Sequence, residues 1–361
     1  MRCASGALLL MLKGMSGGES AIERMRARTN GFTVTPRHFA ILAAVALGAM
    51  TVIVLTGELV RLTGSGLGCP TWPRCYGHLY PPLRGHALVE FGNRVVTIPV
   101  CIIAVATWLA ALRRRPYRRD LVWLSFLLPL GVVAQAILGG LTVLGKLDYG
   151  WVMAHFCLSM LVILAAAALL WRTHHPPGAR PLNPDRAIVR TGRSLLGLAA
   201  VVVVAGTAAT AAAPDAGGAP GEKINRLTFD GKGTLQFVIE RHAELGALLG
   251  FLAIFLWWLV GKRGGDPLLR RWSTIICVLL GTEGVVGIVQ YETKLPAGVV
   301  WVHIWLACGI WISAIWCCFA SGRLRPQTSA STEHAATGER PTGELAATGE
   351  PSSSGALLTP P

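Results

Sequence analysis

The sequence is poor in charged residues. Asp, Glu, Lys and Arg together make up 14% of the 361 residues, whereas a soluble globular protein usually carries about 25%. Hydrophobic residues make up 52%. The composition is therefore not that of an ordinary soluble enzyme or binding domain.

Acidic residues are especially scarce, at 19 against 33 basic residues, which gives a formal net charge of +14. Such an excess could suggest a nucleic-acid partner. The basic residues, however, occur in short clusters between apolar runs, where orientation in a membrane would place them. We therefore expect a lipid bilayer as the environment and no nucleic-acid partner.

Long apolar runs recur along the chain. Each is close to the roughly 20 residues that a helix needs to cross a hydrocarbon core about 30 Å thick. The pattern predicts an all-α integral membrane protein with eight transmembrane helices. The predicted spans are 39–60, 91–112, 121–143, 150–171, 194–213, 239–261, 272–291 and 299–320.

Basic residues gather in alternate loops. By the positive-inside rule these loops are cytoplasmic, so a multi-pass protein of the cell membrane with both termini inside is predicted. The strongest inner clusters lie in 113–119, 172–193 and 262–271. The outer loops are then 61–90, 144–149, 214–238 and 292–298.

The outer loops alternate between long and short, which suggests two copies of a four-helix unit with pseudo-symmetry. The N-terminal run is too short for a signal peptide, so an uncleaved cytoplasmic segment is expected, with a later start codon left open. The low-complexity C-terminal tail is predicted to be disordered. The expected regions are segment 1–38, half 39–171, linker 172–193, half 194–320 and tail 321–361.

Four residues at the outer ends of the spans carry the strongest functional signal. His242 and His303 are 61 residues apart, and Asn93 and His155 are 62 apart. Two histidines facing each other across a four-helix unit can hold a haem iron axially. We expect His242 and His303 to form such a pair and His155 to ligate a second haem. The alternative for a single histidine is an interfacial residue without a ligand.

Glu90 lies three residues before Asn93, so both are expected on nearly the same face of a helix. A carboxylate at this depth could act as an acid or base, or stabilise a cation at a reacting carbon. The alternative is a salt bridge to Arg94, four residues on. Arg94 is also a candidate partner for the propionates of a bound haem. The sequence alone leaves these alternatives open.

Cys69 and Cys75 lie in the first outer loop, in an oxidising compartment. A disulfide between them is plausible, and an exposed disulfide of this kind could act as a redox relay. Zinc binding is the weaker alternative, because no second ligand pair is evident.

Several segments together resemble haem A synthases. They are Gly57-Glu-Leu-Val-Arg-Leu-Thr-Gly-Ser-Gly66, Cys69-Pro-Thr-Trp-Pro-Arg-Cys75, Glu90-Phe-Gly-Asn-Arg94, and Gln135-Ala-Ile-Leu-Gly-Gly140 with His155. The resemblance covers about residues 39–320. Its first-loop signature is specific, whereas the second half matches mainly through His242, His303 and the helix layout.

The resemblance implies an enzyme that oxidises the C8 methyl of haem O to the formyl group of haem A, with water as the oxygen source. It implies a haem b cofactor between His242 and His303, a substrate haem in the N-terminal half, and Glu90 as the essential glutamate. It also matches the family's loop cysteine pair to Cys69 and Cys75. Haem O synthase is the implied upstream partner; the electron acceptor and any homo-oligomer stay open.

The sequence departs from the family pattern at two places. Many family members have histidine where Asn93 stands, and segment 211–215 lacks the Gly- and His-containing stretch often found there.

Two other function classes are possible. A dihaem electron-transfer protein without haem chemistry would need two ligands in both halves, which Asn93 argues against. A transporter would need helix-breaking residues near mid-membrane and a polar path. We expect neither, because the ionisable groups lie at one outer depth.

Overall fold

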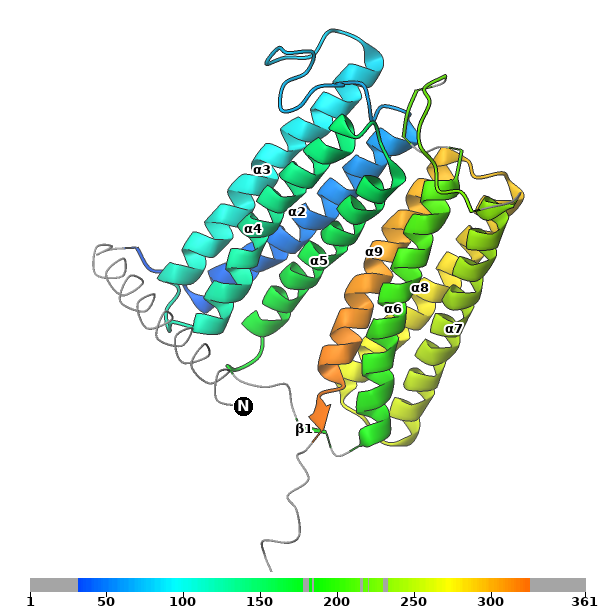
Figure 1. Cartoon of the computed structure of the whole chain (residues 1–361). Coiled ribbons are helices and arrows are strands. Elements are labelled where there is room, and N and C mark those ends of the chain that lie inside the picture. Colours follow the sequence, from blue (N-terminus) through cyan, green and yellow to red (C-terminus); the bar gives the residue numbers. More distant parts are fainter. Residues whose placement is uncertain are drawn as a thin grey trace, which may run out of the picture. The chain divides into compact units, whose positions relative to one another are not determined.

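The structure, a computed structural model, describes residues 32–177, 182–183, 185–214, 217–219, 221–229 and 233–324. Most of the N-terminal segment, and the C-terminal tail from residue 325, lie outside the described residues. In the described part of the chain, eight helices are long and apolar enough to cross a membrane, which confirms the predicted fold class (Figure 1). They are α2 (Pro36–Leu62), α3 (Gly85–Arg113), α4 (Arg119–Leu144), α5 (Tyr149–Thr173), α6 (Arg186–Ala212), α7 (Thr234–Lys262), α8 (Pro267–Glu292) and α9 (Ala297–Ala320).

The helices extend beyond the apolar runs that predicted them. The clearest correction is α6, which begins at Arg186 rather than at 194, so part of the predicted basic linker is helical. Asp185 caps this helix by accepting hydrogen bonds from the N–H groups of Ala187 (2.8 Å) and Ile188 (3.2 Å). Arginine is a good helix former, and a capped first turn needs no apolar residues.

Two prolines lie inside membrane helices, Pro99 in α3 and Pro129 in α4. The expectation that the spans hold no helix-breaking residues was therefore wrong. Both helices nevertheless continue through these positions, which membrane helices tolerate when neighbouring groups satisfy the freed carbonyl. The prolines alone do not make the broken helices that a transporter would need.

The helices pack in two closed rings of four (Figure 1). We call α2–α5 the first bundle and α6–α9 the second bundle. In each ring every helix contacts the next one along the chain, and the first contacts the last. We call the end of the bundles with loops 63–84, 145–148, 213–233 and 293–296 the outer end, after the predicted orientation.

Helix α9 joins the two bundles, since it contacts α2 and α5 as well as its own ring. Three of its tryptophans donate their indole N–H to backbone carbonyls of the first bundle, whose oxygens have a second lone pair beyond the one used in the helix. The bonds are Trp301 to Leu55 (3.0 Å), Trp311 to Met160 (2.9 Å) and Trp316 to Ala167 (3.2 Å). In an apolar environment such bonds fix the register of α9 against its neighbours.

The short outer loops of the two bundles have the same conformation. Both place a Lys-Leu pair in the left-handed region, at Lys146-Leu147 and at Lys294-Leu295. In both, the leucine N–H bonds to a carbonyl five residues earlier, at 2.9 Å in the first loop and 2.8 Å in the second. The loops therefore set the last helix of each bundle in a matching way.

Acidic residues link helix ends at the inner end. Asp120, at the start of α4, binds Arg118 (2.7 Å) and Arg172 of α5 (3.1 Å). Asp185 accepts two hydrogen bonds from Arg263, at 3.0 and 2.9 Å. Burial acts to raise the pKa of Asp185, but the hydrogen bonds from Arg263 and from backbone amides outweigh it and lower the pKa. A short parallel pair, β1 (Leu182–Asn183) with β2 (Arg323–Leu324), also lies at this end.

Candidate functional site

A cavity of about 410 Å³ lies within the first bundle toward the outer end. This volume falls in the range of roughly 300–1,000 Å³ that is usual for cofactor and ligand sites. Glu90, Asn93, Arg94 and His155 all line it, so the structure brings together the four residues predicted for this half. Most of the remaining wall is apolar and comes from all four helices. It includes Met50, Val54, Val100, Val132, Phe156 and Val162.

Glu90 lies in the second turn of α3 and is only 5% exposed. One carboxylate oxygen accepts a 2.6 Å hydrogen bond from the backbone N–H of Cys69. The other accepts from the Arg94 guanidinium at 2.5 Å, so the predicted salt bridge is present. A buried carboxylate needs partners of this kind to remain charged. The salt-bridge alternative is therefore observed, and Glu90 also lines the cavity, whereas its role as an acid, a base or a stabiliser of a cation stays a prediction.

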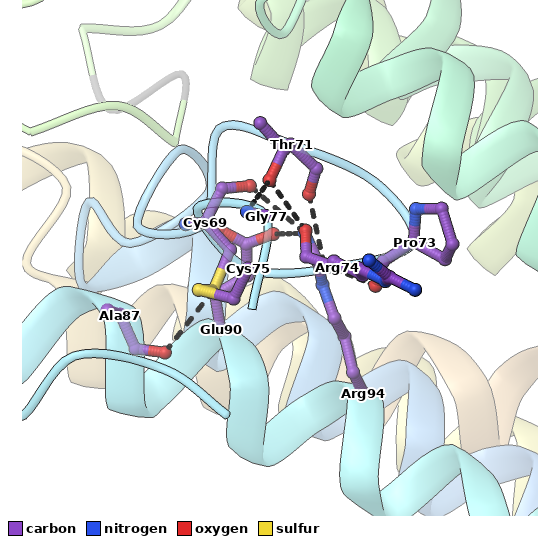
Figure 2. Close-up of polar contacts among 9 residues, drawn as sticks. All are labelled: Cys69, Thr71, Pro73, Arg74, Cys75, Gly77, Ala87, Glu90 and Arg94. Carbon is purple, nitrogen blue, oxygen red and sulfur yellow. Dashed lines mark hydrogen bonds and ion pairs between the residues drawn. A yellow bond between two sulfur atoms is a disulfide. The ribbon is translucent and has the colours of Figure 1, made fainter. Parts of the chain in front are cut away.

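Arg94 connects Glu90 to the first outer loop (Figure 2). Its guanidinium donates to the carbonyl oxygens of Cys69 (3.0 Å), Thr71 (3.2 Å) and Pro73 (3.3 Å). Because these bonds use much of the guanidinium's donor capacity, the contacts of Arg94 are mainly with the protein itself. The loop is thereby fixed over the mouth of the cavity, where Pro73 is part of the lining.

The cysteines of this loop form a disulfide, Cys69–Cys75, with both residues fully buried. This confirms the disulfide alternative over zinc binding. Within the loop, Thr71 donates to the carbonyl of Arg74 at 2.7 Å and accepts from the N–H of Gly77 at 3.2 Å (Figure 2). The loop is therefore closed covalently and by hydrogen bonds just where it binds Glu90.

The side chain of His155 faces the cavity from α5. Its Nδ1 is buried and has no hydrogen-bond partner among the described residues, which is uncommon for a buried polar atom. Gly139 on α4 makes room for the ring, because a Cβ there would lie 3.2 Å from His155 Cε1. Asn93 is held differently, since its Oδ1 accepts a 2.8 Å hydrogen bond from Thr56. An unsatisfied, buried histidine in a cavity fits a metal or haem ligand.

In the second bundle the structure brings His242 of α7 close to His303 of α9. Their ring centres are 6.1 Å apart and the ring planes cross at 74°. A metal–imidazole bond is about 2 Å long, which puts a metal about 3 Å from each ring centre and the two ring centres about 6 Å apart. Both Nδ1 atoms are buried without a hydrogen-bond partner in the described structure. The pair therefore fits the axial ligation of a haem iron that the sequence predicted.

Sequence reasoning missed Glu283 of α8. Its Oε1 lies 3.2 Å from His303 Nδ1, within ion-pair distance, although the geometry is not that of a hydrogen bond. The signal was present in the spacing. Glu283 precedes His303 by 20 residues, just as Gln135 precedes His155.

The two sites match position by position. Each residue of the second site lies 148 or 149 positions after its counterpart in the first. The first set is Gly57, Asn93, Gln135, Gly139 and His155; the second is Gly206, His242, Glu283, Gly287 and His303. The glycines face the same partners in each set. Glu90 and Arg94 break the pattern, because Ile239 and Ala243 stand at the corresponding positions.

A loop of the second bundle also reaches the cavity of the first. Gly217 is part of the cavity lining, and its carbonyl accepts a 2.7 Å hydrogen bond from the N–H of Gly66. A Cβ on Gly66 would lie 2.8 Å from that oxygen, so this approach requires glycine. Sequence reasoning had flagged segment 211–215 only as a departure from the family pattern, and residue 215 lies outside the described residues.

Comparison with known proteins identifies the family. The family model of the COX15-CtaA cytochrome oxidase assembly proteins matches residues 40–87 and 84–220, about half of the chain. The chain belongs to this family. The matched part contains the whole first bundle apart from the start of α2, and also α6.

Individual relatives fall into two named groups. A heme A synthase of Lysinibacillus sphaericus is 37% identical over 141 residues, 37% of this chain and 44% of the relative. One from Geobacillus kaustophilus is 35% identical over 133 residues, 35% of this chain and 41% of the relative. A protoheme IX farnesyltransferase of Thermus thermophilus is 27% identical over 292 residues, 75% of this chain and 47% of the relative. The chain thus spans somewhat less than half the length of these relatives.

Proposed function

We propose that the chain is a haem A synthase that oxidises the C8 methyl of haem O to a formyl group. The observation that carries the proposal is the placement of Glu90, a buried carboxylate at the wall of a cavity of about 410 Å³ that is also lined by His155, whose Nδ1 has no hydrogen-bond partner among the described residues. The second bundle has no carboxylate at the matching position. The names of the heme A synthase relatives support the same activity.

The overall reaction converts a methyl group and one water molecule into a formyl group, four protons and four electrons. The water supplies the formyl oxygen. The site must therefore stabilise positive charge as electrons leave the methyl carbon, and it must accept protons. Both tasks suit a carboxylate next to the substrate.

Glu90 is fixed for this work by two donors, the N–H of Cys69 and the guanidinium of Arg94. Its charge is therefore in place before the substrate reacts, and little reorganisation is needed. Within the same cavity, His155 binds the iron of the substrate haem. Asn93 contributes no iron ligand, because a carboxamide is not a usual haem ligand. The substrate iron thus keeps one position without a protein ligand.

In the second bundle, His242 and His303 would hold the resident cofactor, haem b, which would supply one-electron transfer there. Gly206 makes room for the His242 ring, because a Cβ there would lie 3.0 Å from it, whereas a Cβ at Gly287 would be in ordinary contact with His303 at 3.9 Å. The acceptor has no signature in the described residues.

The likeness to a farnesyltransferase that acts on protohaem IX supports an upstream partner. A farnesylating haem O synthase would supply the substrate. The proposed location is the cell membrane, with both termini in the cytoplasm, because the arginine-rich ends of α3, α4, α6 and α8 lie together at the inner end.

Haem analysis tests the proposal. The full chain is expressed in a host that makes haem O but no haem A, and extracted haems are separated by chromatography. We expect haem A with the wild type and haem O without haem A with Glu90→Gln, while haem b is present in both. Glu244→Gln, which changes an exposed glutamate of the second bundle, is the control and should still yield haem A. Bound haem b with no haem A from the wild type would contradict the proposal and favour a dihaem relay.

A further inference from the structure

We propose that Glu283 is a positioning residue for the second site. It accepts the Nδ1 proton of His303, holds the ring in place and lowers the reduction potential of the iron that this ring binds. This inference rests on the proposed function only in that the bound group is haem b.

The Glu283 carboxylate is isolated from other charged side chains in the described structure. The side chain is 14% exposed, and His303 is the one side chain within ion-pair distance of it among the residues the structure describes. The second oxygen, Oε2, is buried and has no hydrogen-bond partner there. A buried carboxylate without a full set of partners is costly, especially at membrane depth. Its presence therefore indicates a functional rather than a structural role.

The matching position in the first bundle holds a neutral amide, Gln135. Gln135 uses its amide to donate to the backbone carbonyl of His155 (3.2 Å) and to the hydroxyl of Ser159 (2.6 Å). It thus binds its neighbour's backbone and leaves the His155 ring alone. A neutral amide is sufficient to tie these helices together. The second bundle has a negative charge at this position and directs it at the histidine ring instead.

A carboxylate on the far nitrogen of a metal-bound histidine fixes the tautomer and the ring orientation and makes the ligand more basic. A more basic ligand stabilises the more highly charged, oxidised iron. Glu283 therefore favours ready re-oxidation of the relay by its acceptor. In the first site, where the iron belongs to a substrate and not to a relay, this device is absent.

The test is a redox titration of the purified protein, followed in the b-type haem absorption bands. Glu283→Gln keeps the size and an acceptor oxygen but removes the charge. We expect its midpoint potential to shift to a more positive value. Glu292→Gln removes an exposed carboxylate from the end of the same helix and should leave the potential unchanged. Wild-type protein without haem b would refute the cofactor assignment, whereas bound haem b with no shift in Glu283→Gln would overturn the role of Glu283.

A second measurement covers the case in which Glu283→Gln does not retain haem. In His303→Gly, which should lose haem b, haem b is added back together with imidazole, which can take the place of the lost ring and donate its free N–H to Glu283. We expect imidazole and 4-methylimidazole to bind roughly ten-fold more tightly than 1-methylimidazole, which has no N–H to donate. The two methylated ligands have the same size, so the comparison isolates the N–H. Equal binding of all three would overturn the inference.

Discussion

The two bundles place a histidine of their last helix against a glycine of the helix before it, yet the charged residues around the two histidines differ. In the first bundle the charge at the cavity is on two ion pairs, Glu90 with Arg94, which is bound to a loop, and Glu58 with Arg61. In the second it is on Glu283, directly beside the ring of His303. The same scaffold can therefore carry two kinds of site.

This difference separates a carboxylate that supports a bound haem from a carboxylate that can take part in the reaction. A carboxylate that contacts a ligand histidine tunes the reduction potential of the bound metal. A carboxylate across the cavity can instead contact the substrate atoms that react. The glycines and the helix spacing are shared by both sites, so they belong to the scaffold. A substitution that changes one site can therefore be compared with the unchanged other site as an internal reference.

The largest effect is expected from Arg94→Ala. This change removes the partner of Glu90 and releases three loop carbonyls, so the carboxylate loses its fixed position. Misplacement of a reacting group can reduce a rate by about 100-fold, and we expect a loss of this order in haem A formation per enzyme. The spectrum of the second site should not change. Arg84→Ala, in the same outer region but with no side-chain capping bond, is the matched control.

Replacing the scaffold glycines should affect the two sites unequally. A Cβ at Gly206 would lie 3.0 Å from the His242 ring, whereas one at Gly57 would lie 4.0 Å from Asn93. We expect Gly206→Ala to weaken haem b binding roughly ten-fold, as disturbed ligand support does in other metal sites, and Gly57→Ala to have little effect. The amount of haem b retained during purification measures the effect of each variant. Equal retention in Gly206→Ala and in the wild type would show that the His242 ring does not need the space left by Gly206. Alanine favours helix, so a loss could not come from helix propensity.

Trp311→Phe tests how firmly the bundles are joined. It removes the indole bond to Met160 and should lower stability by about 1 kcal/mol, the usual scale for such bonds in membranes. Thermal unfolding in detergent should show the decrease, and both sites should be lost at the same lower temperature. Trp305→Phe, on the exposed face of α9, should change nothing. Separate transitions for the two sites would mean that the bundles unfold independently.

The smallest effect is expected at the inner end. Asp185→Asn removes a pairing with Arg263, whose side chain is 53% exposed, so we expect less than about 1 kcal/mol. Because the folded pKa of Asp185 is lowered, its contribution is complete above about pH 4, the ordinary Asp pKa. It is lost as the pH falls through the lowered value. The difference in melting temperature between variant and wild type should therefore disappear on acidification, and a difference that grew would contradict this account.

Hydropathy predicted all eight helices because each is long and apolar, and helical spacing predicted the Glu90–Arg94 pair. The helix ends were less predictable. Caps such as Asp185 add polar turns that an apolar window does not detect. The approach of Gly217 to the first cavity was also missed, since contacts of an irregular loop leave no periodic signal. Glu283 stood alone in an apolar run, and its contact with His303 became clear only in the structure, although its spacing matches that of Gln135.

The central claim is a division of labour between the bundles, and haem composition of two purified variants tests it most directly. In a host that makes both haem b and haem O, His303→Ala should lack haem b and still bind haem O. His155→Ala should keep haem b and lack haem O. Loss of the same haem from both variants, or the reverse assignment, would contradict the account.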